Sequence, residues 1–360
     1  MGAAPMQALA SFRNDYSEGA HPRLLQALVR ASAAQHTGYG LDAHSVRAAE
    51  LILARCGQPQ AQVHLLAGGT QTNLLAISAF LRPHEAVIAA NSGHIATHET
   101  GAIEATGHKV LVTPHVDGKL TPDGVRALLA ENTSEHMVKP RLVYVSNTTE
   151  LGTIYRKAEL QALRALCDRA GLLLYLDGAR IGCALTAAGN DLSLADIAAL
   201  THAFYIGGTK NGALLGEALV VVAPSLQPDL RYLIKQRGAM LAKGMVVGAQ
   251  FEALFEHELF FELAAHANAM AQRLQSGLKA AGVPLLIDSP SNQVFPILTH
   301  AQIEALAGFT SFERWSPYDQ TRAVIRLVCS WATGQEAVDG LLSCITGLFR
   351  HDPPRSATGS

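Results

Sequence analysis

Three short motifs place reactive side chains beside glycines, and each follows an apolar run. Lys210 lies in "YIGGTKNG", Asp177 ends the apolar run of "LLLYLDGARIG", and Gly69 and Thr70 lie in "LLAGGTQTN". A carboxylate is costly to bury unless a cation or hydrogen-bond donors meet it, and a lysine in a dry site loses its proton readily. The three motifs could therefore supply a nucleophilic amine, a counter-charge for a cation and an anion-binding turn.

Each motif alone also has an ordinary structural interpretation. The Gly-Thr turn could be a plain strand–helix connection, and it matches neither the GxGxxG nor the P-loop pattern. Asp177 could pair locally with Arg180, and Lys210 could extend to solvent, the usual fate of a lysine. The order of the motifs along the chain, with Lys210 33 residues after Asp177, favours a common site.

Pyridoxal phosphate requires this combination of groups. Its phosphate suits a glycine turn at a helix N-terminus, its pyridine nitrogen needs a carboxylate such as Asp177, and its aldehyde forms a Schiff base with a lysine such as Lys210. His94, in "NSGHIATHETGA", could stack on the ring or be purely structural. Gly207 and Gly208 are expected to leave room for the cofactor beside the backbone, and Thr209 is expected to face the phosphate.

Apolar runs and helical patterns alternate through the first two thirds of the chain and would position these motifs. Strands are predicted at 62–66, 85–90, 141–146, 172–177, 203–208 and 217–223, and helices at 70–81, 121–131 and 157–171. This alternation predicts an α/β domain with a mainly parallel sheet covered on both faces. In such sheets ligands bind at the carboxyl ends of the strands, where the motifs lie.

The pattern changes near Gln227. A long helical stretch is followed by expected short strands in "VPLLID", "QVFPIL" and "AVIRLVCSW" and by helices in "HAQIEALAG" and "GQEAVDGLLSCITGLF". The predicted division is a large cofactor-binding domain at 1–245, a smaller α+β domain at 246–350 and a flexible tail at 351–360. The N-terminal segment is allowed to pack on the smaller domain.

Composition excludes several classes of protein. The formal net charge is −2 without a basic cluster, which argues against nucleic-acid binding. No apolar run approaches the roughly 20 residues of a membrane span, and the first residues lack signal-peptide features. The five cysteines show no metal-binding spacing, so we expect no metal site and reduced thiols in a cytoplasmic protein. Charged residues make up only 16%, which would suit an oligomer.

From about Asn14 to Trp331 the sequence resembles the threonine aldolase and β-eliminating lyase family of fold-type I pyridoxal-phosphate enzymes. The resemblance rests on "GGTQTN", "GHIATHETGA", "PRLVYVSNTTELGTIY", "YLDGARIG", "GGTKNGALLGEA" and "IRLVCSW". It implies retro-aldol cleavage, and its reverse, of L-β-hydroxy-α-amino acids such as threonine, allo-threonine and phenylserine, giving glycine and an aldehyde. Other fold-type I reactions, such as β-elimination or racemisation, and a catalytically silent protein of this fold are the alternatives.

The resemblance also implies residue roles. It makes Lys210 the Schiff-base lysine, Asp177 the partner of the pyridine nitrogen and His94 the stacking group, and it places Gly69 and Thr70 at the phosphate. It further implies that Arg180 contacts both cofactor and substrate carboxylate, and that Arg326 is the second carboxylate arginine. An arginine suits that task because its planar fork binds both oxygens.

Two motifs depart from the family pattern. Asn14 stands near a position where many members have a carboxylate-binding serine, and Thr149 of "NTTE" stands where many have a histidine near the substrate hydroxyl. The base for the β-hydroxyl therefore remains open between His94, His98, His21 and an ordered water. Family resemblance also implies a homodimer or homotetramer, in which Tyr39 completes a neighbour's site.

Overall fold

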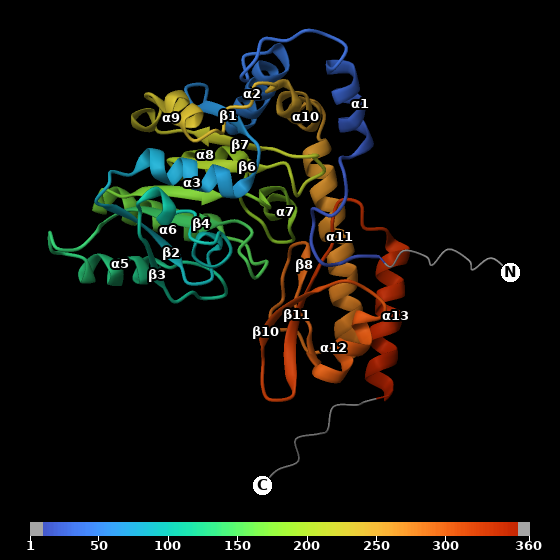
Figure 1. The fold of residues 1–360 in the computed structure, drawn as a ribbon. Helices are drawn as coiled ribbons and strands as arrows, with labels where there is room; N and C mark the ends of the chain where they lie inside the picture. The colour runs from blue at the N-terminus through green and yellow to red at the C-terminus, as the bar shows by residue number, and fades with distance from the viewer. Residues whose placement is uncertain (1–9, 352–360) are drawn as a thin grey trace. The chain divides into compact units, whose positions relative to one another are not determined.

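The computed structural model describes residues 10–351, and they divide into two compact units. The large unit comprises residues 19–265, and the small unit comprises residues 10–18 together with those from His266 onward. Figure 1 shows the course of the chain. The tail predicted at 351–360 lies, from residue 352 onward, outside the described residues.

The division between the units falls at 265/266, inside α11 (Leu259–Ala280), whereas the sequence suggested 245/246. Helix packing explains the difference. Helix α10 (Met245–Glu256) lies so close to α2 (Ala43–Cys56) that a Cβ at Gly248 would come within 2.6 Å of the Ser45 nitrogen. The segment after residue 245 therefore belongs to the large unit's own core.

Within the described residues, the large unit contains a seven-stranded sheet in the order β1-β7-β6-β5-β4-β2-β3. Its strands are β1 (Gln62–Leu66), β2 (Glu85–Ala90), β3 (Val110–Thr113), β4 (Lys139–Ser146), β5 (Leu173–Asp177), β6 (Ala203–Gly207) and β7 (Glu217–Val221). Only β7 runs against its neighbours β1 and β6, and the other pairings are parallel. The predicted α/β fold with a mainly parallel sheet is confirmed.

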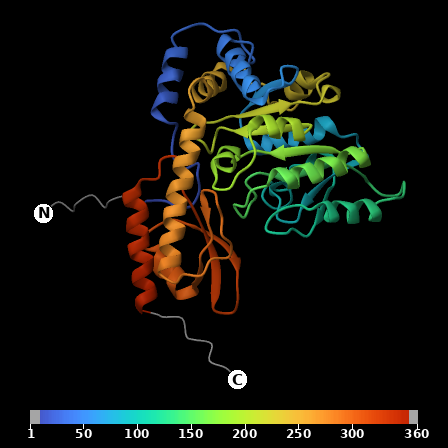
Figure 2. The ribbon, with the colours of Figure 1, turned by 180° about the vertical axis from the view of Figure 1, so that it is seen from behind.

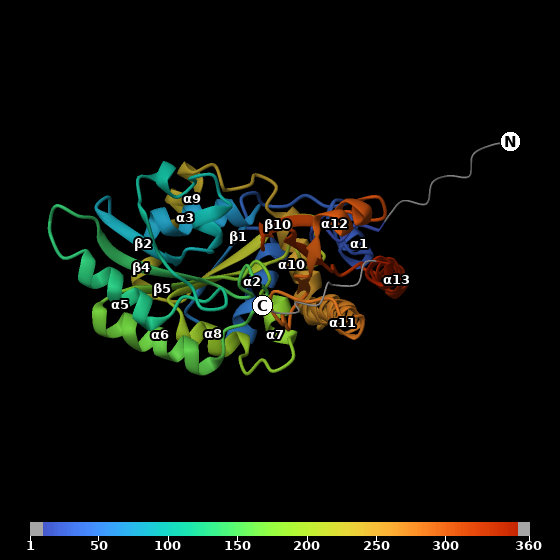
Figure 3. The ribbon, with the colours of Figure 1, turned by 90° about the horizontal axis from the view of Figure 1, so that it is seen from below.

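Helices cover both faces of this sheet (Figure 3). Helices α3 (Gly69–Phe80) and α9 (Leu230–Gln236) lie on one face, where their apolar residues share a buried cluster with the strands. The other face carries α5 (Pro122–Glu131), α6 (Lys157–Ala170) and α8 (Leu194–Leu200). The remaining elements are α1 (Pro22–Ala31), α4 (His94–Thr97), α7 (Ile181–Thr186) and the 3-10 turns Glu104–Thr106 and Pro224–Leu226.

Capping residues set several helix boundaries that the sequence predicted. The Thr121 side chain accepts a hydrogen bond from the Gly124 backbone and opens α5. Helix α6 ends at Gly171, whose φ of 64° lies in the left-handed region that glycine adopts without strain. Both helices match their predicted ranges within a residue.

The small unit is α+β. Its strands are β8 (Gln293–Val294), β9 (Ile297–Thr299), β10 (Glu313–Pro317) and β11 (Arg322–Val328), and its helices are the second part of α11, α12 (His300–Ala307) and α13 (Gln335–His351). Figure 2 shows this unit from behind. Apolar residues of its helices and strands, together with Phe12, form its buried core.

The strand predicted in "VPLLID" is wrong. That segment makes only one isolated bridge, between Leu285 and Pro296. Pro284 and Pro296 have no N–H to donate, so a continuous ladder cannot form there. Proline also explains why "QVFPIL" forms two short strands, β8 and β9, rather than one.

No helix among the described residues is both long enough and apolar enough to cross a membrane.

Candidate active site

The carboxyl ends of the parallel strands bring Asp177, Lys210 and His94 to one edge of the sheet. Asp177 is the last residue of β5, β4 ends beside it at Ser146, and Lys210 follows β6 by three residues. His94 follows β2, which pairs with β4. Such an edge is where open α/β sheets bind ligands.

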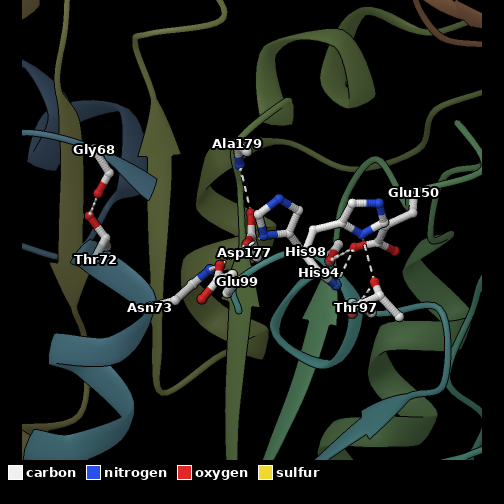
Figure 4. A network of polar contacts seen from close by, with 12 residues as sticks. Gly68, Thr72, Asn73, His94, Thr97, His98, Glu99, Glu150, Asp177 and Ala179 are labelled. Carbon is white, nitrogen blue, oxygen red and sulfur yellow. Dashed lines mark hydrogen bonds and ion pairs between the residues drawn. The ribbon is translucent and has the colours of Figure 1, made fainter. Parts of the chain in front are cut away.

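Asp177 is a buried carboxylate surrounded by hydrogen-bond donors (Figure 4). Its Oδ2 accepts from Asn73 Nδ2 at 2.9 Å and from the Tyr144 hydroxyl at 2.6 Å, its Oδ1 accepts from the Ala179 backbone at 3.0 Å, and the Tyr205 hydroxyl also bonds to it. Burial by itself would raise the pKa of Asp177, but the charge of His94 and these hydrogen bonds lower it below its usual value. The structure thus keeps this carboxyl ionised.

His94 is oriented by two glutamates. Its Nδ1 lies 2.8 Å from Glu99 Oε1, and its backbone N–H donates to Glu150 Oε1 at 2.9 Å. Asn73 joins this group to Asp177, since its Nδ2 also donates to Glu99 at 2.7 Å. The His94 ring stacks with that of His98, with centroids 5.5 Å apart and 15° between the planes. The histidine ring is therefore held in a fixed orientation near Asp177.

Glu150, the neighbour of Thr149 in the chain, contacts the His94 backbone. Thr149 is buried, and its Oγ1 lies 2.7 Å from Thr153 Oγ1 within a turn. Glu150 accepts from Ser146 Oγ at 2.8 Å as well as from His94, and burial raises its pKa. A role for Thr149 in substrate binding stays a prediction.

The turn carrying Gly69 and Thr70 opens α3 with Gly68 as N-cap and without a side-chain cap. First-turn N–H groups that no side chain caps, together with the helix dipole, suit an anion. A Cβ at Gly69 would come within 3.1 Å of the Tyr205 hydroxyl, which bonds to Asp177. Glycine at this position therefore also protects the donors around Asp177.

The glycines before Lys210 have a reason beyond the one expected. A Cβ at Gly207 would lie 2.3 Å from the Ala179 carbonyl oxygen, and one at Gly208 would lie 2.7 Å from the Gly216 carbonyl oxygen. They allow close backbone packing, and their part in leaving room for a cofactor stays a prediction. Thr209 also has a partner in the loop, because its Oγ1 accepts from the Gly216 backbone at 3.1 Å, so its phosphate contact stays a prediction.

Three further predicted residues of the large unit have other surroundings in the structure. Arg180 is half-buried and precedes α7, close after Asp177 in the chain. Tyr39 lies beside α9, with Lys235 Nζ 4.4 Å from its ring centroid, and it does not belong to the Asp177 network in this chain. His21 caps α1, since its Nδ1 accepts from the Arg23 backbone at 3.2 Å.

Asn14 and Arg326 belong to the small unit. Asn14 Oδ1 accepts from the Tyr16 backbone at 3.0 Å and from Ser17 Oγ at 2.8 Å. Arg326, in β11, forms an ion pair with Glu313, and its guanidinium carbon lies 4.8 Å from a ring centroid of Trp315. Their parts in substrate binding stay predictions.

Sequence reasoning missed several residues of the network, namely Asn73, Glu99, Tyr144, Glu150 and Tyr205. One signal was available for the tyrosines. Tyr144 and Tyr205 interrupt otherwise apolar strands, and a buried tyrosine hydroxyl needs a hydrogen-bond partner. Tyr144 also shares a strand face with Ser146, two residues on, at the carboxyl end of β4.

Comparisons with known proteins agree with this geometry. A family model for β-eliminating lyases matches residues 12–301. A low specificity L-threonine aldolase of a Pseudomonas strain is 32% identical over 94% of this chain and 97% of its own length. A low specificity L-threonine aldolase of Saccharomyces cerevisiae is 26% identical over 82% and 76%.

Solved structures show the same relationship. A threonine aldolase of Leishmania major superposes with a TM-score of 0.92 at 51% identity, covering 94% of this chain and 99% of that one. An aspartate aminotransferase of Thermus thermophilus, at 18% identity and a TM-score of 0.72, covers 94% and 91% and shows the fold alone. The chain belongs to the β-eliminating lyase family and, with it, to the pyridoxal-phosphate enzymes of fold type I.

Proposed function

We propose that this protein is an aldehyde-lyase that cleaves L-β-hydroxy-α-amino acids, such as L-threonine, L-allo-threonine and phenylserine, to glycine and an aldehyde. Relatives named threonine aldolase support the reaction class. The observation that carries the proposal is Asp177, a buried carboxylate kept ionised at the sheet edge that also holds His94 and Lys210.

The residues at this edge fit pyridoxal phosphate. Asp177 is a buried anion, and the groups that donate hydrogen bonds to it are neutral. His94 acts on it through its charge, and the protonated pyridine nitrogen would add a second positive charge. The start of α3, at Gly69 and Thr70, lacks a side-chain cap and offers N–H groups to a phosphate. Lys210 provides the amine.

When bound, the cofactor supplies an electron sink for the carbanion that cleavage of the Cα–Cβ bond leaves. The chain's residues prepare that step. Asp177 would hold the ring nitrogen of the cofactor by its negative charge, Lys210 would hold its aldehyde carbon, and His94 presents a ring whose orientation Glu99 fixes. Tyr144 and Asn73 keep Asp177 ionised.

Substrate recognition rests on two arginines in this proposal. Arg180 and Arg326 would bind the α-carboxylate, because a guanidinium binds both carboxylate oxygens at once. Arg326→Lys keeps the charge but loses the fork, so we expect KM for L-threonine to rise about tenfold or more. Arg322→Lys is the matched control, since Arg322 lies in the same strand and pairs with Asp319. An unchanged KM in Arg326→Lys would remove Arg326 from the proposed site.

The proposed reaction can be tested with purified protein. L-Threonine, L-allo-threonine and phenylserine should each give glycine and an aldehyde, and the protein should show a visible absorption band that borohydride bleaches. Lys210→Ala should abolish both, whereas Lys109→Ala, at an exposed lysine, should preserve both. Release of an oxo acid in place of glycine would refute the aldolase reaction and favour elimination.

We also propose that the protein is a cytoplasmic homodimer or homotetramer. Large apolar side chains are exposed on the large unit, among them Val29 (73%), Leu41 (57%) and Tyr232 (78%). Burial raises the pKa of the Cys56 and Cys167 thiols to about 12, which suits unreactive core residues in a reducing compartment. Light scattering of the purified protein would give a monomer mass if the assembly were absent.

A further inference from the structure

Glu217 is a buried carboxyl group to which the proposed mechanism gives no role. It is the first residue of β7, where it pairs with Gly207 at the end of β6 and with Leu66 at the end of β1. Its exposed fraction is 4%. A glutamate this deep in a sheet is rare unless something stabilises its charge or holds it protonated.

Its hydrogen bonds come from the two residues that precede Lys210. The Gly208 backbone N–H donates to Glu217 Oε2 at 3.1 Å, and the Thr209 side chain is hydrogen-bonded to the same carboxyl. The loop is closed on itself, because the N–H groups of Gly208 and Thr209 both donate to the Gly216 carbonyl. Glu217 is thus tied to the segment that presents Lys210.

Several charged or titratable groups act on Glu217. Burial raises its pKa to about 8, and the bond from Thr209, the positive charge of Lys210 and the bond from Gly208 oppose that rise. The negative charge of Asp177 works in the same direction as burial, and Tyr175 and Tyr205 also interact with Glu217 through its charge. Of the groups named here, Lys210 alone supplies a positive charge.

We propose that Glu217 is a positioning residue. It holds the loop that presents Lys210, and its negative charge controls how readily this lysine loses the proton that it must lose before its amine can act as a nucleophile. The inference rests on the proposed function only in taking Lys210 as the reactive lysine.

The pair can be tested in the full chain after the cofactor is removed with hydroxylamine. Brief pulses of acetic anhydride across a pH series label a lysine only when its amine is unprotonated, and mass spectrometry quantifies each labelled peptide. Exposed Lys109 serves as an internal standard. Loss of the nearby negative charge in Glu217→Gln should move the labelling midpoint of Lys210 down by about one pH unit or more. Glu217→Asp should restore much of that shift.

Glu85→Gln is the matched control. Glu85 is also a buried glutamate that starts a strand of this sheet and accepts from a backbone N–H, that of Arg82. The Glu85→Gln variant should leave the labelling midpoint of Lys210 unchanged. If Glu217→Gln fails to fold, Thr209→Val serves instead, because losing this donor makes Glu217 harder to ionise and should lower the midpoint in the same direction.

A second readout uses the loaded protein. The pH at which the visible band of the lysine-linked cofactor changes should also fall in Glu217→Gln, since the carboxylate favours a proton on the lysine nitrogen. Unchanged midpoints in both experiments, in a variant whose circular dichroism matches the parent and whose unfolding is cooperative, would overturn the inference. A different result would refute the proposed function, namely that the parent protein releases no glycine and aldehyde from its substrates.

Discussion

Asp177 and Glu217 are both buried carboxyl groups at one edge of the same sheet, yet the structure treats them in opposite ways. Each is 4% exposed. The pKa of Asp177 lies below its usual value, and that of Glu217 is raised to about 8. Burial is the largest single influence on both and favours the protonated form in both, so burial cannot explain the difference.

The number and kind of partners explains it. Asp177 has the charge of His94 and hydrogen bonds from Tyr144, Tyr205, Asn73 and the Ala179 backbone. Glu217 has two donors, Gly208 and Thr209, and the positive charge of Lys210 that acts on it is opposed by the negative charge of Asp177. A carboxyl that must stay charged is surrounded by donors, whereas a buried carboxyl with fewer donors takes up a proton more readily.

The largest effect should come from removing the charge of Asp177. Asp177→Asn keeps the shape but cannot hold a proton on the cofactor's ring nitrogen, so kcat for L-threonine should fall about 10³-fold or more. Glu217→Gln should cost much less, about tenfold, because Glu217 acts only through Lys210. Steady-state assays of both variants at one pH measure this, and equal losses would remove the distinction between the two carboxyls.

A single donor to Asp177 should have a smaller effect. Tyr144→Phe removes the 2.6 Å hydrogen bond, so the pKa of Asp177 should rise by about one unit and the acid limb of the kcat profile should move up with it. Tyr175→Phe is the control, because the Tyr175 hydroxyl donates to Asn73 Oδ1 and not to Asp177. If both variants moved the acid limb alike, general packing rather than the hydrogen bond would be the cause.

The two carboxyl groups also differ in whether the sequence alone could identify them as part of the site. Asp177 and Lys210 were predicted because each follows an apolar strand, and the carboxyl ends of parallel strands meet at one edge. Glu217 looked like an ordinary strand residue. Its partners, Gly208 and Thr209, reach it only after β6 and β7 pair antiparallel, which local pattern does not specify.

The donors of Asp177 were hidden for the same reason. Asn73 lies on α3, and its contact with Asp177 crosses 104 residues of sequence. The large unit's strands and helices were predicted closely, because long apolar strands and capped helices leave strong local signals. In the small unit, the prolines at 284 and 296 prevented one predicted strand and divided another into β8 and β9.

The two carboxyl groups should change the free energy of unfolding with pH in opposite directions. The folded pKa of Glu217 is raised, so between about pH 4.5 and 8 the folded state binds more protons than the unfolded state, and the free energy of unfolding falls as pH rises. Asp177 behaves oppositely, because its lowered pKa makes its contribution disappear only as pH falls below its usual value near 3.8. Urea titrations of Glu217→Gln and the parent should therefore diverge in favour of the variant from pH 5 to 9. A constant difference would show that Glu217 does not titrate in this range.

The smallest expected effect concerns a buried base, His202, which can be compared with the two buried carboxyl groups. His202 precedes β6, at the opposite end of the strand from Lys210, and burial lowers its pKa to about 4. Its Nδ1 accepts from the Leu174 backbone at 2.8 Å, so protonation would break that bond. The unfolded state takes up a proton first, so stability present above about pH 6.5 is lost as pH falls toward 4. His202→Asn keeps an acceptor without titrating, and it should flatten this loss by about 1 kcal/mol, a modest amount because the ring is partly exposed to solvent. Equal slopes in urea titrations of the two proteins would mean that His202 becomes protonated in the folded state as easily as in the unfolded one. Neither its burial nor its bond with the Leu174 backbone would then control its titration.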